Sequence, residues 1–249
     1  MSGPSHHERR LSFGAAASQY DRFRPTYSRE AVRWLSEGAA REVREVADIG
    51  AGTGALTRVL IERGLAVTAI DPDENMLDQL LAGTPRAVGV VGRAEALPLA
   101  EGSVDAITVG QAWHWFEPEA AAREFTRVLR PGGVIGLLWN DRDDREPWLA
   151  QLRTIVEGED WVRHTKTDAL AQIGAVLPGV ELNRFAHVVA MSPEAVVGLV
   201  GTFSFVRLRD DADEICAAVG ELLRAHPDTR GKATIEVPYL TTVYRAPRP

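Results

Sequence analysis

Apolar residues alternate between short strand-like runs and longer segments with helical spacing over the first part of the chain. The strand-like runs cover residues 45–48, 66–71, 87–91, 104–110 and 133–139. The helix-like segments between them lie near residues 55–63, 74–81 and 118–129. This alternation is typical of a parallel sheet whose strands are connected by helices, and ligands bind such sheets at the carboxyl ends of the strands.

The pattern changes after residue 140. A charged loop at 141–146 leads into a further helix near 147–156. Strands near 181–189 and 234–244 would finish the sheet, and two helical patterns, 193–203 and 211–224, lie between them. We expect these two helices to form a cap that shapes a substrate pocket. An amphipathic helix near 28–39 follows an aromatic stretch and is a candidate lid.

The first strand ends in an acid and leads into a loop with three glycines, Gly50-Ala51-Gly52-Thr53-Gly54. Glycine lets a ligand approach the backbone closely, so a strand that passes through such a loop into a helix presents N–H groups to a ligand. With Ala55 the run also fits the relaxed dinucleotide fingerprint. The glycines therefore predict a nucleotide-type cofactor without separating NAD from other nucleosides.

Two carboxylates narrow the class of cofactor. Asp48 lies two residues before the first glycine, where it can accept from a cofactor ammonium or from loop amides and would repel a pyrophosphate. Asp71 ends the second strand, where its carboxylate suits a ribose diol. An acid at this second position is shared with NAD sites, so Asp71 supports a nucleoside without specifying a methyl donor.

Several motifs occur in the order found in one enzyme family. They are Asp48 to Gly54, Asp71 with Pro72 and Met76, Gly92 to Pro98, Ser103 to Phe116, and Arg130 to Gly133 before residues 134–139. In these motifs the chain resembles the class I S-adenosylmethionine-dependent methyltransferases from about residue 13 to residue 248. The fourth motif is similar to that of the methyltransferase type 11 subgroup, which includes trans-aconitate-methyltransferase-like proteins.

The resemblance implies a Rossmann-like doubly wound α/β sheet, mostly parallel with an antiparallel last strand, plus a helical cap. Within one domain it implies a lid segment at 1–40, an S-adenosyl-L-methionine-binding core at 41–140, and the remaining strands with the cap at 141–249. Relatives often carry an aspartate where this chain has Arg93, so the Ala94 amide is the better candidate for an adenine contact. The implied cofactor-binding residues are Asp48, Gly50, Ala51, Gly52, Thr53, Gly54, Asp71, Pro72, Met76, Ala94, Glu95, Gln111 and Tyr20.

Methyl transfer from a sulfonium is an in-line displacement that needs alignment and desolvation more than a strong acid or nucleophile. A general base becomes useful when the acceptor is a hydroxyl or an amine, and His114, after the fourth strand, is the candidate. The same imidazole could instead only shape the pocket. Arg142 or Arg145 could pair with an acceptor carboxylate. The candidate substrate-binding residues are Trp113, Trp115, Trp139 and Asn140.

Composition and charge limit the classes of partner that this chain can have. A formal charge of -7 over 249 residues argues against nucleic acid as the acceptor and favours a small molecule. The polar start fits neither a secretory signal nor a membrane span, so we expect a cytoplasmic protein. The single cysteine, Cys216, excludes an intramolecular disulfide, the six histidines show no metal spacing, and no apolar segment indicates an oligomeric state.

Two other classes of function stay open at this point. A nicotinamide-dependent oxidoreductase would share the glycine loop and Asp71, although the chain has no Tyr-x-x-x-Lys pair. A non-catalytic S-adenosylmethionine-binding protein would be expected to have lost donor-loop residues, and Asp48, Gly50 and Gly52 are all present. The sequence therefore predicts a methyltransferase first.

Overall fold

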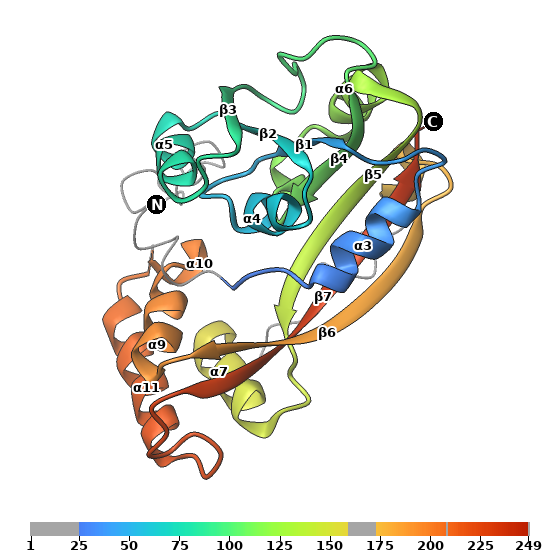
Figure 1. Cartoon of the computed structure of the whole chain (residues 1–249). Helices are drawn as coiled ribbons and strands as arrows, with labels where there is room; N and C mark the ends of the chain where they lie inside the picture. The colour runs from blue at the N-terminus through green and yellow to red at the C-terminus, as the bar shows by residue number, and fades with distance from the viewer. Residues whose placement is uncertain (1–24, 159–172, 208, 249) are drawn as a thin grey trace.

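The computed structural model describes residues 25–158, 173–207 and 209–248, which form a seven-stranded sheet (Figure 1). The strand order is β3-β2-β1-β4-β5-β7-β6. The strands are β1 Glu45–Ile49, β2 Ala66–Asp71, β3 Val88–Val91, β4 Val104–Gly110, β5 Leu129–Arg142, β6 Glu181–Met191 and β7 Ile235–Pro247.

The first five strands along the chain are parallel to one another, and the last strand runs against both of its neighbours. β1 pairs in parallel with β2 and β4, and β4 pairs in parallel with β5. β7 lies between β5 and β6 and is antiparallel to each. The predicted fold class, a mostly parallel Rossmann-like sheet with an antiparallel last strand, is confirmed.

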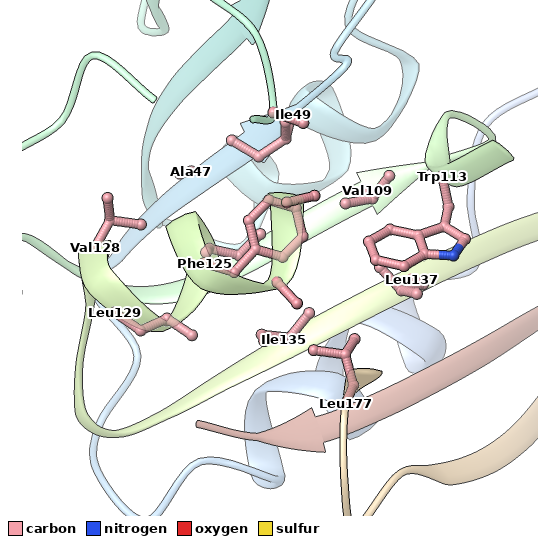
Figure 2. Close-up of a cluster of buried hydrophobic side chains, with 14 of the residues drawn as sticks. Ala47, Ile49, Val109, Trp113, Phe125, Val128, Leu129, Ile135, Leu137 and Leu177 are labelled. Atoms are coloured by element: carbon pink, nitrogen blue, oxygen red, sulfur yellow. The ribbon is translucent and has the colours of Figure 1, made fainter. Parts of the chain in front are cut away.

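Helices cover both faces of the sheet because the central strands β1, β4 and β5 are apolar on both sides. On one face lie α3 (Arg29–Glu37), α4 (Ala55–Glu62) and α5 (Glu74–Gly83). On the other lies α6 (Pro118–Val128), whose Phe125 is fully buried among side chains of β1, β4 and β5 (Figure 2). Alternation along each strand divides its residues between the two faces.

Local sequence signals explain where these helices begin. The Ser28 side chain accepts a hydrogen bond from the Ala31 amide at the start of α3, and the Asp73 carboxylate accepts from the Asn75 amide at the start of α5. Such side chains satisfy backbone donors that have no partner within the helix. α6 begins at Pro118, a residue whose fixed φ suits the first helical position.

The cap helices form a separate hydrophobic cluster with the ends of β6 and β7. These helices are α7 (Pro147–Glu157), α9 (Pro193–Gly201), α10 (Ser204–Arg207) and α11 (Ala212–Ala225). Figure 1 shows them together at the end of the sheet where β5 finishes. The cap therefore lies beside the carboxyl ends of the parallel strands.

Three expectations differ from the structure. β5 is twice as long as the predicted strand. Asp141 and Arg142 were expected in a loop, but they pair with Leu240 and Tyr239, because β7 offers a long antiparallel partner. The boundary expected after residue 140 thus falls inside a strand. The helix expected at 193–203 ends at Gly201, and α10 follows it.

The candidate lid helix has a packing role in the structure. α3 lies against β5, β6 and β7, and its Leu35 is buried on the sheet. Of the lid segment, Pro25 reaches the wall of the main cavity described below. Tyr20, the predicted cofactor contact in this segment, lies outside the described residues.

Candidate active site

The three glycines of the loop after β1 all adopt positive φ, between +54° and +88°. A Cβ at Gly50 would lie 2.6 Å from the Cβ of Ala112, and one at Gly54 would lie 2.7 Å from the side chain of Leu80. At Gly52 a Cβ would meet nothing within 4 Å. Packing thus requires glycine at the first and third positions, while Gly52 borders open space in which a ligand can approach the backbone.

Asp71 connects the glycine loop to the helix that follows β2. One carboxylate oxygen accepts from the Gly52 amide at 2.9 Å, and the other accepts from the Asp73 amide at 3.0 Å. The side chain is half-buried and lines the main cavity. The two bonds fix the carboxylate at the edge of the sheet.

Asp48 is buried beneath the loop, where its two oxygens accept from the hydroxyls of Thr57 (2.6 Å) and Thr108 (2.8 Å). Burial raises the pKa of Asp48 to about 6, and the two hydroxyls oppose that rise. A side pocket of about 60 Å³ lies against Asp48 and is also lined by Tyr27 and Gln111. The carboxylate therefore connects β1, α4 and β4.

The main cavity has a volume of about 410 Å³ and opens at the carboxyl ends of β1, β2, β4 and β5. Small-molecule sites commonly measure roughly 300 to 1,000 Å³. The predicted residues that line it are Gly50, Gly52, Asp71, Pro72, Met76, Ala94, Glu95, Gln111, His114, Trp115 and Asn140. Sequence motifs far apart in the chain therefore meet at one site.

Other predicted cofactor residues lie outside the main cavity. Asp48, Ala51 and Thr53 line the side pocket, which shares Gly50, Gly52, Gln111 and Asn140 with the main cavity. Gly54 lines neither space, because it is buried as the N-cap of α4 against Leu80.

The structure brings only one of the three predicted tryptophans to the main cavity. His114 and Trp115 lie on a short 3₁₀ helix, Trp113–Trp115, with their rings 4.7 Å apart, and both line the cavity. Trp113 turns into the core and packs against Phe125 (Figure 2). Trp139 packs edge-on against Tyr244, because alternation along β5 directs it away from its neighbour Asn140.

Gln111 is the one described residue other than glycine with positive φ, at 57°. Its backbone N–H donates to the Leu138 carbonyl and its side-chain amide to the Asn140 carbonyl, each at 2.9 Å. A strained backbone of this kind persists where the surrounding structure holds it, often at functional sites. Gln111 therefore holds the end of β4 to β5 between the two spaces.

Asn140, expected to bind substrate, has both ends of its side chain in use. Its amide nitrogen donates to the Thr26 carbonyl at 2.8 Å, and its oxygen accepts from the Thr241 hydroxyl at 2.8 Å. The amide nitrogen of Ser28 also donates to that hydroxyl. Asn140 thus fastens the segment before α3 to β5 and β7 at the cavity wall.

The cap supplies a wall that the sequence analysis largely missed. Arg142, Glu157, Leu199, Phe203 and Tyr239 line the main cavity from the cap side. Apart from Arg142, which was a candidate, they carry no local motif, since they are spread from Glu157 to Tyr239 and meet only through the fold. Arg145 is exposed and lies in a bidentate ion pair with Asp143, outside the cavity lining.

Comparison with known proteins agrees with this arrangement. The profile of the family described as "Methyltransferase domain" matches residues 47–137. An uncharacterized methyltransferase of Mycobacterium tuberculosis is 41% identical over 240 residues, which cover 95% of each chain. The chain belongs to the class I S-adenosylmethionine-dependent methyltransferases.

Solved structures of other proteins are similar to this methyltransferase in fold. A putative type II methyltransferase from Anaeromyxobacter dehalogenans superposes with a TM-score of 0.72 at 28% identity, covering 91% of this chain and 98% of that one. A Haemonchus contortus N-methyltransferase, solved with S-adenosylhomocysteine, superposes with a TM-score of 0.57 at 14% identity over 99% of this chain and 60% of that one.

A further relative carries a more specific name. The malonyl-[acyl-carrier protein] O-methyltransferase of Methylococcus capsulatus is 37% identical to this methyltransferase over 172 residues, or 64% of this chain and 59% of that one. In the described part of the methyltransferase, no helix is long and apolar enough to cross a membrane. The same residues contain no group of three or more His, Cys, Asp or Glu placed to hold a metal ion.

Proposed function

We propose that this methyltransferase moves a methyl group from S-adenosyl-L-methionine to an oxygen atom, of a carboxylate or a hydroxyl, on a small molecule. The observation that carries the proposal is the main cavity, which is lined by the glycine loop and Asp71 together with His114, Trp115 and the cap wall. One space therefore offers a nucleoside site and an acceptor site side by side.

The residues at the sheet edge fit the donor. Asp71 would accept from ribose hydroxyls, and the open space at Gly52 leaves room for the ligand beside the loop backbone. Met76 and Ala94 offer a buried apolar surface for an adenine ring. The side pocket at Asp48 would take the amino acid end, where a carboxylate complements an ammonium. When bound, the donor supplies a methyl group whose bonding electrons stay with its sulfur.

The acceptor side needs groups that align an oxygen and exclude water. Trp115 covers part of the cavity with an indole, and His114 presents an exposed imidazole beside it. His114 would take the proton of a hydroxyl acceptor, whereas for a carboxylate acceptor it would only donate a hydrogen bond and orient the oxygen. An oxygen acceptor agrees with the name of the Methylococcus relative, an O-methyltransferase of a malonyl group.

Calorimetric titration with S-adenosylmethionine, S-adenosylhomocysteine and NAD, in separate runs on protein checked for copurified ligand, tests the donor. We expect both sulfur nucleosides to bind and NAD not to bind. Small carboxylic acids and alcohols are then incubated with the protein and S-adenosylmethionine, and mass spectrometry of the products tests methyl transfer. Binding of NAD alone would contradict the donor assignment, and donor binding with no methylated product would favour a non-catalytic binding protein.

A further inference from the structure

Arg142 lies at the end of β5, on the wall of the main cavity that faces the cap. Its side chain is 13% exposed, and its guanidinium lies 5.1 Å from the centre of the Phe203 ring. One nitrogen is 3.7 Å from a carboxylate oxygen of Glu157, whose side chain is 12% exposed. A cation is thus held in a largely buried position between an aromatic ring and a carboxylate.

The guanidinium keeps most of its hydrogen-bonding capacity for another partner. An arginine side chain carries five N–H donors, and charge-assisted hydrogen bonds to carboxylates measure about 2.7 to 2.9 Å. The contact of 3.7 Å with Glu157 is longer than that. In the part of the chain that the structure describes, the Arg142 side chain makes no hydrogen bond, so its N–H donors at the cavity wall are available to a ligand.

Register separates this guanidinium from the donor residues. Asp71 ends β2 and Arg142 ends β5, three strands away in the sheet, or about 14 Å at 4.8 Å per strand. Arg142 also lies four residues beyond Leu138, the partner of Gly110, which adds about 13 Å along the strand. Asp71, and Asp73 whose amide donates to it, therefore lie far from Arg142 across the sheet.

We propose that Arg142 binds a carboxylate of the methyl acceptor, which rests on the methyltransferase function proposed above. The planar guanidinium matches a carboxylate through two parallel hydrogen bonds. Glu157 and Asp141 also line this end of the cavity. They oppose a doubly charged phosphate more strongly than a singly charged carboxylate. The acceptor is therefore a carboxylic acid held at a fixed point relative to His114 and Trp115.

Calorimetry on the full chain saturated with S-adenosylhomocysteine tests this proposal. The probes are glutarate, benzoate and trans-aconitate. Each is compared with the compound in which every carboxylate is replaced by a primary amide, and phenyl phosphate is the phosphate probe. We expect at least one acid to bind, and its amide to bind about 10- to 100-fold more weakly because charge-assisted hydrogen bonds are lost. Arg142→Met should weaken that acid by a similar factor and leave S-adenosylhomocysteine affinity unchanged.

Two further variants separate recognition from structural support. Glu157→Gln removes the competing carboxylate and should tighten acid binding several-fold, whereas a purely structural ion pair would lose affinity or stability when broken. This variant also tests the proposal if Arg142→Met does not fold. Arg145→Met is the matched control, because Arg145 pairs with Asp143 outside the cavity, and it should bind the acid like the wild type.

The proposal is overturned if none of the acids binds, if amides or phenyl phosphate bind as well as the acids, or if Arg142→Met binds the acid normally. Weaker acid binding by Glu157→Gln would also overturn it. Failure of the wild type to bind S-adenosylhomocysteine is a different result, because it removes the methyltransferase function on which the acceptor site depends.

Discussion

The side-chain amide of Gln111 donates to the backbone carbonyl of Asn140 at 2.9 Å, joining the residue after β4 to β5 at the rim of both spaces. This contact is made from a backbone with φ of 57°. For a residue with a Cβ, the left-handed region is unfavourable by roughly 1–2 kcal/mol. The strain therefore accompanies a link between the end of β4 and β5, made by two residues that line both spaces.

Comparing glycine and alanine at position 111 isolates this strain. Both Gln111→Gly and Gln111→Ala remove the side-chain hydrogen bond, but only glycine relieves the positive φ. We expect the glycine variant to be more stable than the alanine variant by about 1 kcal/mol in urea unfolding. Ala82→Gly on the exposed surface of α5 should show the opposite sign. Equal stability of the two Gln111 variants would mean that the backbone relaxes without strain.

The buried carboxylate of Asp48 predicts a specific dependence of stability on pH. Its pKa is about 6 in the folded protein against an ordinary 3.8, so the folded state binds the proton more tightly and wild-type stability falls as pH rises from about 4 through 6. Asp48→Asn removes this loss. Relative to wild type, the variant should gain up to about 3 kcal/mol between pH 4 and pH 8, at about 1.4 kcal/mol per pKa unit. A difference that does not change with pH would contradict the raised pKa.

Much of the sheet can be predicted because each strand from β1 to β4 carries its own local signal. Apolar runs, the glycine loop and the caps at Ser28 and Asp73 are contained within a few neighbouring residues. The extension of β5 to Arg142 depends instead on β7, about a hundred residues later. The local pattern of apolar and polar residues does not indicate a pairing at that separation. The charges of Asp141 and Arg142 therefore predict a loop.

The candidate site divides in the same way. Ligands bind parallel sheets at the carboxyl ends of the strands, and this rule predicted that Asp71, Gly52 and His114 line one cavity, because these ends share an edge of the sheet. The rule gives no side-chain direction, and so it did not separate Trp115, which faces the cavity, from Trp113, which is buried in the core. Asn140 has the predicted position, but its hydrogen bonds to Thr26 and Thr241 depend on distant segments.

His114→Ala should separate the two roles open to this histidine. If its imidazole takes a proton from the acceptor, turnover should fall by about 100-fold or more, since general base catalysis contributes on that order. S-adenosylhomocysteine affinity should be retained, because the donor residues are unchanged. The measurement is a steady-state assay with an identified acceptor beside calorimetry, with Glu119→Ala on the exposed side of α6 as the control. Undiminished turnover would remove His114 from the mechanism.

Asp71→Ala should weaken S-adenosylmethionine binding by about 1.5–3 kcal/mol, the loss of charge-assisted hydrogen bonds to the ribose. The substitution also leaves the Gly52 and Asp73 amides without this acceptor, so unfolding should be measured in parallel. Asp78→Ala, on the exposed surface of the same α5 helix, controls for the removal of a charge and should bind normally. Unchanged calorimetric affinity in folded Asp71→Ala would exclude Asp71 from the donor site.

Gly136 of β5 packs against Leu35 of α3. A Cβ at this position would lie 1.8 Å from Cδ1 of Leu35, so Gly136→Ala should lower the free energy of unfolding by about 3 kcal/mol. Leu35→Ala alone should also destabilise, by leaving a cavity, but the double variant should lose less than the sum, because each change makes room for the other. Gly83→Ala, whose Cβ would meet only Arg58 at 3.8 Å, should be neutral or slightly stabilising in the same urea titrations. Additive losses at positions 35 and 136 would show that this contact does not set the distance between α3 and the sheet.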